Sequence, residues 1–77
     1  MTTSRTEIDL EQSNMELHDL CQPLTALQCR LEMAGILGQP EAFQEAVRGG
    51  LEETRRMFAI VAQMRQRLLE IQATARQ

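Results

Sequence analysis

The sequence has 77 residues, a formal net charge of −3 and only two aromatic side chains. So short a chain forms one small domain and buries too little surface for a comfortable stability margin, so we expect it to oligomerise. Leu, Ala, Met, Glu, Gln and Arg dominate the composition and favour helix over strand. Every basic residue is Arg, and these residues do not form the clustered basic footprint that nucleic-acid binding requires. The sequence therefore predicts an all-helical protein that does not bind nucleic acid.

Membrane segments and metal sites are also not expected. No apolar run approaches about 18 residues, and residues 1–12 lack the apolar core of a secretory signal, so this segment should make no membrane contact. Cys21 and Cys29 would lie two turns apart on one helix, too far for a disulfide, and we expect them to be small buried residues in a reducing compartment. One histidine and two separated cysteines predict neither a metal site nor a cofactor bound by this chain.

Gly38, Gln39 and Pro40 interrupt an otherwise helical pattern. Gly suits a helix C-cap, and Pro suits the first turn of the following helix. We therefore expect one domain over residues 1–77, with a helix at about 6–37, a turn at 38–40 and a helix at about 41–75.

The start of the first helix has two candidates. Ser4 with Glu7 and Ser13 with Glu16 both fit the S-x-x-E capping box, in which the serine side chain accepts a backbone N–H bond. The sequence alone leaves both open.

Apolar residues recur at alternating spacings of three and four on both helices, which is the pattern of a helix packed along one stripe. On the first helix the apolar stripe consists of Leu10, Leu17, Leu20, Leu24, Leu27, Leu31 and Ala34. Ser13 interrupts it, because it occupies the position where an apolar residue is expected. The second helix carries Phe43, Val47, Gly50, Thr54, Met57, Val61, Met64, Leu68 and Ile71. Further apolar residues flank both stripes, so a single antiparallel hairpin would still expose apolar surface. We expect two hairpins to form a homodimeric four-helix bundle.

Two features depart from ordinary helix rules. Gly49 and Gly50 inside the second helix cost about 2 kcal/mol together relative to alanine, and we interpret them as a site of close helix approach. Folding the hairpin at residue 39 predicts Gly50 opposite Gln28 and Cys29. Pro23 lies in the middle of the first helix, where it removes one hydrogen bond and should kink the axis.

His18 is the only histidine in the chain. It lies beside the Leu17 and Leu20 stripe rather than on it, so its side chain should face solvent. A neutral imidazole is a usable nucleophile near pH 7, and a carboxylate that accepts the proton of its other nitrogen makes it a stronger one. Asp19 is the candidate for that base.

Residues 18–27 read His-Asp-Leu-Cys-Gln-Pro-Leu-Thr-Ala-Leu. This segment resembles the H-box of the HisKA-type histidine kinases, in which His is followed by Glu or Asp, an aliphatic residue, two variable positions and Pro-Leu on one helix. The remainder resembles their dimerisation and histidine phosphotransfer domain only in architecture. The resemblance implies that His18 is the phosphoacceptor, that Asp19 is its acid/base partner and that Pro23 marks the helix bend.

The same resemblance extends to phosphatase activity and partner contacts. Family members that dephosphorylate their response regulator often carry Thr or Asn four residues after the acceptor to orient a water, whereas this chain has Gln22. Gln can also hydrogen-bond water, but its longer side chain reaches a different point, so a water-orienting role for Gln22 and phosphatase activity both stay open. The regulator of the family docks just below the acceptor, which implies contacts with Thr25, Arg55 and Arg56.

The family also implies the partners and location of the chain. ATP and Mg²⁺ would act only through a separate ATP-binding catalytic domain, because residues 1–77 contain no phosphate-binding loop of their own. We expect a homodimer that also binds a response-regulator receiver, in the cytoplasm or as the cytoplasmic part of a membrane-anchored sensor. Two alternatives are a dimeric helical adaptor without chemistry and a standalone histidine phosphotransfer protein. The stimulus, the cognate regulator and cis or trans phosphorylation are not encoded in any motif.

Overall fold

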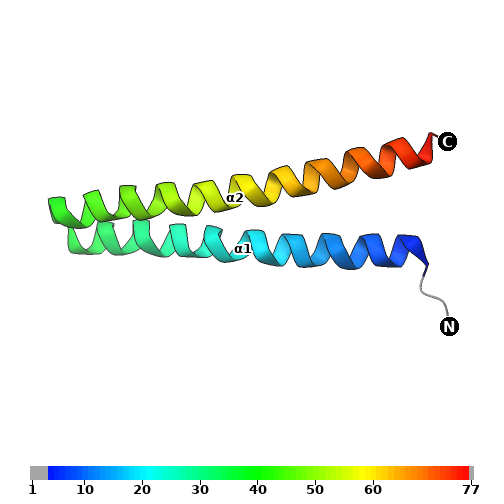
Figure 1. The fold of residues 1–77 in the computed structure, drawn as a ribbon. Helices are drawn as coiled ribbons and strands as arrows, with labels where there is room; N and C mark the ends of the chain where they lie inside the picture. The colour runs from blue at the N-terminus through cyan, green and yellow to red at the C-terminus, as the bar shows by residue number, and fades with distance from the viewer. Residues whose placement is uncertain (1–3, 77) are drawn as a thin grey trace.

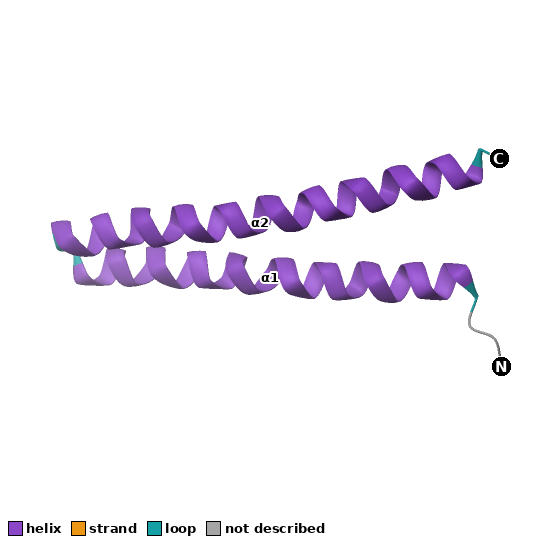
Figure 2. Ribbon diagram, viewed as in Figure 1, coloured by secondary structure: helices purple, strands orange, loops and turns teal. Residues whose placement is uncertain are grey.

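Two long helices make up the protein. The computed structural model describes residues 4–76, with α1 at Arg5–Leu37 and α2 at Pro40–Ala75. The helices run antiparallel and pack against each other, so that the start of α1 and the end of α2 lie at the same end of the molecule (Figure 1). No strand occurs among the described residues, and only a two-residue loop separates the helices (Figure 2). The all-helical prediction is confirmed, and both helices agree with the expected ranges to within one residue.

Local capping chemistry sets the helix ends. The Ser4 hydroxyl accepts a hydrogen bond of 3.1 Å from the backbone N–H of Glu7, so Ser4 and not Ser13 is the N-cap of α1. At the other end, Gly38 adopts the left-handed conformation with φ 64°, and its N–H donates to the Ala34 carbonyl at 2.9 Å. Pro40 then opens α2, where a missing N–H has no cost.

Near the turn, small residues let the two helices approach closely. Ala34 and Ala46 are only 3% and 5% exposed. A Cβ on Gly50 would lie 2.9 Å from Leu27 Cδ1, so this glycine lies where a larger side chain would meet the opposite helix. The expected close approach is confirmed. The expected partners are wrong by one residue, because counting back from the turn sets only the level along α1. At that level the stripe residue Leu27 faces Gly50, while Gln28 is exposed.

Towards the chain ends the helices diverge (Figure 1). The contact there is polar, because Arg67 of α2 donates to the Ser13 hydroxyl at 2.9 Å and forms an ion pair with Glu16. Both charged side chains are 17% exposed. The hairpin therefore has two different halves, one close-packed through small residues and one held by an ion pair.

Much of the expected apolar stripe does not face the other helix. Leu10 and Leu17 on α1 are 60% and 50% exposed, and Leu68 on α2 is 54% exposed. Leu24, Leu31, Val47 and Val61 are exposed too. The hairpin buries one edge of the stripe and leaves the other edge open along the full length of the molecule.

Cys21 and Cys29 correct a further expectation. Both are free thiols, but both are exposed in the hairpin rather than buried. Cys29 lines an open groove between the helices, together with Ala42, Glu45 and Ala46 of α2. The apolar character of the two cysteines had suggested burial, but a single hairpin leaves both side chains accessible.

Candidate functional site

His18 lies on the outer face of α1. It is exposed, and it is separated from the buried Pro23 by five residues, which at about 100° per residue places the two side chains on nearly opposite faces of the helix. The Gln22 amide nitrogen lies 3.4 Å from His18 Nε2. An amide nitrogen donates, so this contact is compatible with a neutral ring in which Nε2 accepts and Nδ1 carries the proton. The predicted exposure of His18 is confirmed.

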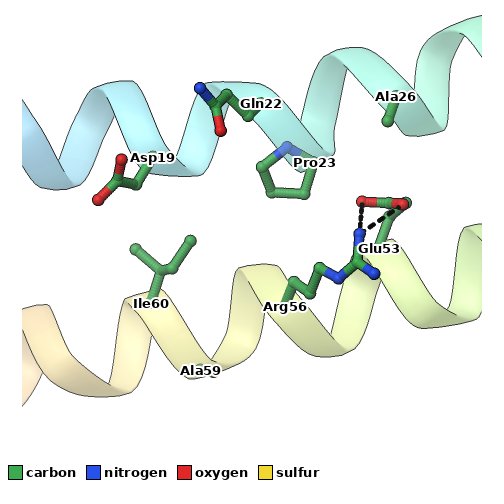
Figure 3. Close-up of a pocket in the computed structure, with 8 residues that line it drawn as sticks. All are labelled: Asp19, Gln22, Pro23, Ala26, Glu53, Arg56, Ala59 and Ile60. Atoms are coloured by element: carbon green, nitrogen blue, oxygen red, sulfur yellow. Dashed lines mark hydrogen bonds and ion pairs between the residues drawn. The ribbon is translucent and has the colours of Figure 1, made fainter.

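Asp19 lies one residue further round the helix and lines a groove between the helices (Figure 3). The groove has a volume of about 520 Å³ and is open to solvent. Its α1 wall consists of Asp19, Gln22, Pro23 and Ala26, and its α2 wall consists of Glu53, Arg56, Ala59 and Ile60. No hydrogen bond joins Asp19 to His18 among residues 4–76, so the acid/base contact expected from the sequence is not formed in this conformation.

Pro23 lies in the floor of the groove and is buried against α2. It has no N–H to donate to the carbonyl of Asp19, four residues earlier, although α1 continues through it as one helix. Two residues later the Thr25 hydroxyl is exposed and donates to the Cys21 carbonyl at 2.8 Å. Backbone bonding of α1 is therefore altered within one turn of His18, as the sequence predicts, without interrupting the helix.

Glu53 is the residue of this groove that sequence analysis missed. It is 4% exposed, yet it carries a carboxylate whose two oxygens accept from Arg56 at 3.0 and 3.3 Å. The Arg56 side chain is 65% exposed, so one partner of the pair is buried and the other faces solvent. Figure 3 shows this pair beside Pro23 and Ala26, on the turn side of Asp19. Arg55 is exposed and does not line the groove.

A seven-residue repeat on α2 was the available signal for Glu53. Ala46, Glu53, Ile60 and Arg67 follow one another at that spacing, and all four are buried or half-buried. We expected only apolar residues between the helices, and two of these four residues are charged, so the repeat was not recognised. A seven-residue pattern that also allows charged residues would have included it.

Within residues 4–76, neither helix contains an apolar stretch long enough to span a membrane. The same residues contain no group of three or more His, Cys, Asp or Glu side chains arranged to hold a metal ion. Comparisons with protein-family models, curated proteins and solved structures found no match to this chain.

Proposed function

We propose that this chain is the dimerisation and phosphoacceptor domain of a two-component histidine kinase, with His18 as the residue that carries the phosphoryl group. The observation that carries the proposal is an exposed histidine followed on the same helix by Asp19 and by a buried proline five residues later. This order of residues is the part of the chain that resembles the H-box. The open groove beside it offers a surface on which a second protein can lie.

The chemistry follows from the tautomer that Gln22 favours. The lone pair of His18 Nε2 attacks the terminal phosphorus of ATP held by a separate catalytic domain, and an N–P bond forms while the bond from phosphorus to the leaving ADP oxygen breaks. The ring then carries an extra positive charge. A rotated Asp19 carboxylate accepts the Nδ1 proton or stabilises it in place. In the second transfer the N–P bond breaks as a carboxylate oxygen of a receiver aspartate takes the phosphoryl group.

The open apolar edge supports the dimeric part of the proposal. Leu10, Leu17, Leu24 and Leu31 on α1 are exposed at seven-residue intervals, and Val47, Val61 and Leu68 on α2 are exposed at multiples of seven residues, so they form a ridge on one side of the hairpin. A second copy related by a two-fold axis along the bundle would bury the same ridge on both partners. The product is a parallel homodimer with four helices, in which each His18 stays on the outer surface.

The groove supports the receiver contact. It begins beside His18, at Asp19 and Gln22, and continues towards the turn past Arg56. Arg56 uses one nitrogen for Glu53, which leaves its remaining N–H groups available to an acidic partner. Arg55 and Thr25, expected as further contacts, are exposed one face away from this groove.

The test uses labelled ATP, a kinase catalytic domain of the same type and three versions of the chain. We expect acid-labile label on the wild type, none on His18→Gln, and slower labelling of Asp19→Asn at unchanged helix content. ATP without the catalytic domain should give no label.

Each alternative predicts a different result. Label that persists in His18→Gln would overturn the assignment. A wild-type chain that dimerises but is never labelled, either by a kinase domain or by a phosphorylated receiver, would favour the helical adaptor. Labelling by a phosphorylated receiver alone would favour a standalone phosphotransfer protein.

A further inference from the structure

A single arginine makes every inter-helix side-chain hydrogen bond within residues 4–76. Arg67 on α2 donates to the Asp9 carbonyl at 3.4 Å and to the Ser13 hydroxyl at 2.9 Å, and it forms an ion pair with Glu16. We call Arg67 and these three acceptors the clasp. It lies on the chain-end side of His18, in the half of the hairpin where the helices diverge (Figure 1).

The clasp should favour one arrangement of the two helices but add little to the stability of the hairpin. A buried ion pair stabilises one geometry of its two helices, while desolvation removes much of the gain from the attraction itself. Arg67 Nε is also buried without a hydrogen-bond partner among the described residues. An unsatisfied buried donor destabilises the closed state, so the clasp should open more readily than an apolar seam of the same length.

The segment that the clasp holds carries His18. Glu16 lies two residues before His18, and Pro23 lies five residues after it. Pro23 cannot donate to the Asp19 carbonyl, so α1 lacks one of its backbone hydrogen bonds between His18 and the close-packed half. On the turn side of Pro23, the approach of Leu27 to Gly50 fixes α1 against α2. A break of the clasp would therefore let residues 5–22 pivot at Pro23 while residues 24–37 stay in place.

We propose that Arg67 is a positioning residue for His18, which acts by clasping the histidine-bearing half of α1 against α2. This inference rests on the proposed phosphoacceptor function for its consequence, but the clasp itself is independent of that function. The closed clasp gives His18 one orientation on the bundle. When the clasp is open, the His18 side chain stays exposed but takes several orientations. This lowers the rate of phosphoryl transfer without preventing approach of the phosphoryl donor.

Hydrogen exchange of the full chain tests the clasp without any phosphate chemistry. Arg67→Met keeps a long apolar stem and removes the donors, and Arg65→Met is the matched control, because Arg65 is an exposed arginine one half-turn away. We expect amides in residues 8–20 of Arg67→Met to exchange at least about tenfold faster than in the wild type, with residues 24–37 changed far less. Arg65→Met should match the wild type. Exchange that rises equally in both halves, or not at all, would overturn the clasp.

A charge exchange distinguishes the ion pair from simple packing. Glu16→Arg alone places two arginines together and should open this half, whereas Glu16→Arg combined with Arg67→Glu should restore part of the protection. A double variant no better protected than the two single ones would show that the pair itself does not hold the helices.

Phosphoryl transfer then tests the positioning role. For Arg67→Met we expect a several-fold lower kcat for labelling of His18 by the kinase domain at nearly unchanged KM for the chain, while Arg65→Met stays at wild-type values. Labelling of Arg67→Met at the wild-type kcat, despite faster exchange in residues 8–20, would overturn the positioning role. A wild-type chain without label would overturn the proposed function instead, and the exchange result would still decide whether the clasp exists.

Discussion

Different interactions hold the two helices together in the two halves of the hairpin. In the half near the turn, alanine and glycine bring the helix backbones close, and Ala34 and Ala46 are the buried hydrophobic residues of positions 4–76. In the half near the chain ends, an arginine reaches across a wider gap to Glu16. Close packing of small residues gives a rigid joint, whereas a single ion pair gives a specific but separable one. His18 belongs to the separable half.

The largest effect should come from the surface that both halves share. Val61→Glu introduces a charge into the exposed apolar ridge, where a second hairpin would bury it without a partner. Because a dimer of this size has little stability to spare, we expect loss of helix and of dimer together. Circular dichroism and sedimentation of the same sample measure both.

Gln63→Glu is the control for that change. Gln63 is exposed on the same helix, two residues and about half a turn from Val61, so it tests added charge away from the ridge. Its helix content and sedimentation should match the wild type. A Val61→Glu chain that remained a helical dimer would show that the apolar ridge is not the interface.

The next prediction contrasts glycines inside and outside the close-packed half. Gly50→Val forces a branched side chain against Leu27 and should destabilise the protein by about 1–3 kcal/mol, since overpacking outweighs the gain in helix propensity. Gly35→Ala meets nothing within 4 Å and should stabilise it by about 0.5–1 kcal/mol, because alanine loses less backbone entropy. Thermal denaturation at one protein concentration gives both signs. Equal effects at the two positions would mean that the helices are not close at Gly50.

Sequence reasoning predicted the two helices and the turn, but not which residues of the wide apolar stripe face the other helix. The Gly38 cap and Pro40 set the turn locally, whereas Ser4 and Ser13 were both possible N-caps until the Ser4 hydrogen bond was seen. Apolar residues spread so widely round each helix that several faces could pack with similar burial. Leu17 and Leu24 are therefore exposed, and Leu27 rather than Gln28 lies opposite Gly50.

The candidate site also has a part that the sequence predicted and a part that it did not. His18, Asp19, Gln22 and Pro23 follow one another on one helix, so the motif and its exposure could be read directly. Glu53 comes from the other helix, and its burial depends on the small side chains of Pro23 and Ala26 opposite it. A carboxylate in a seam violates the apolar pattern by which seams are recognised, so only the assembled hairpin places it beside the motif.

Arg56 lies between the two halves, and its replacement tests the ion pair with the buried Glu53. Arg56→Ala leaves the buried Glu53 carboxylate without its partner and should destabilise the protein by about 1–2 kcal/mol, less than for a fully buried pair because Arg56 is largely exposed. The same change should weaken binding of a cognate receiver several-fold. Arg55→Ala, one residue away and outside the groove, should change stability by less than about 0.5 kcal/mol. Calorimetric titration of both variants measures the binding, and a larger loss for Arg55→Ala would place the receiver on a different face.

The smallest expected effect concerns the contact between Gln22 and His18. Gln22→Ala removes an exposed hydrogen bond of 3.4 Å to His18 Nε2, so unfolding stability should change by less than about 0.5 kcal/mol. The imidazole should respond nonetheless, because loss of the amide donor removes the preference for the tautomer with its proton on Nδ1. Nitrogen chemical shifts of the ring, measured well above the ordinary histidine pKa of about 6.5, report the tautomer ratio. Gln28→Ala is the control, since Gln28 is exposed on the same helix and donates to Glu32 instead. A ratio that is the same in wild type, Gln22→Ala and Gln28→Ala would show that Gln22 does not orient the ring, and the choice of Nε2 as the attacking nitrogen would then need another cause, of which the Asp19 carboxylate is the nearest.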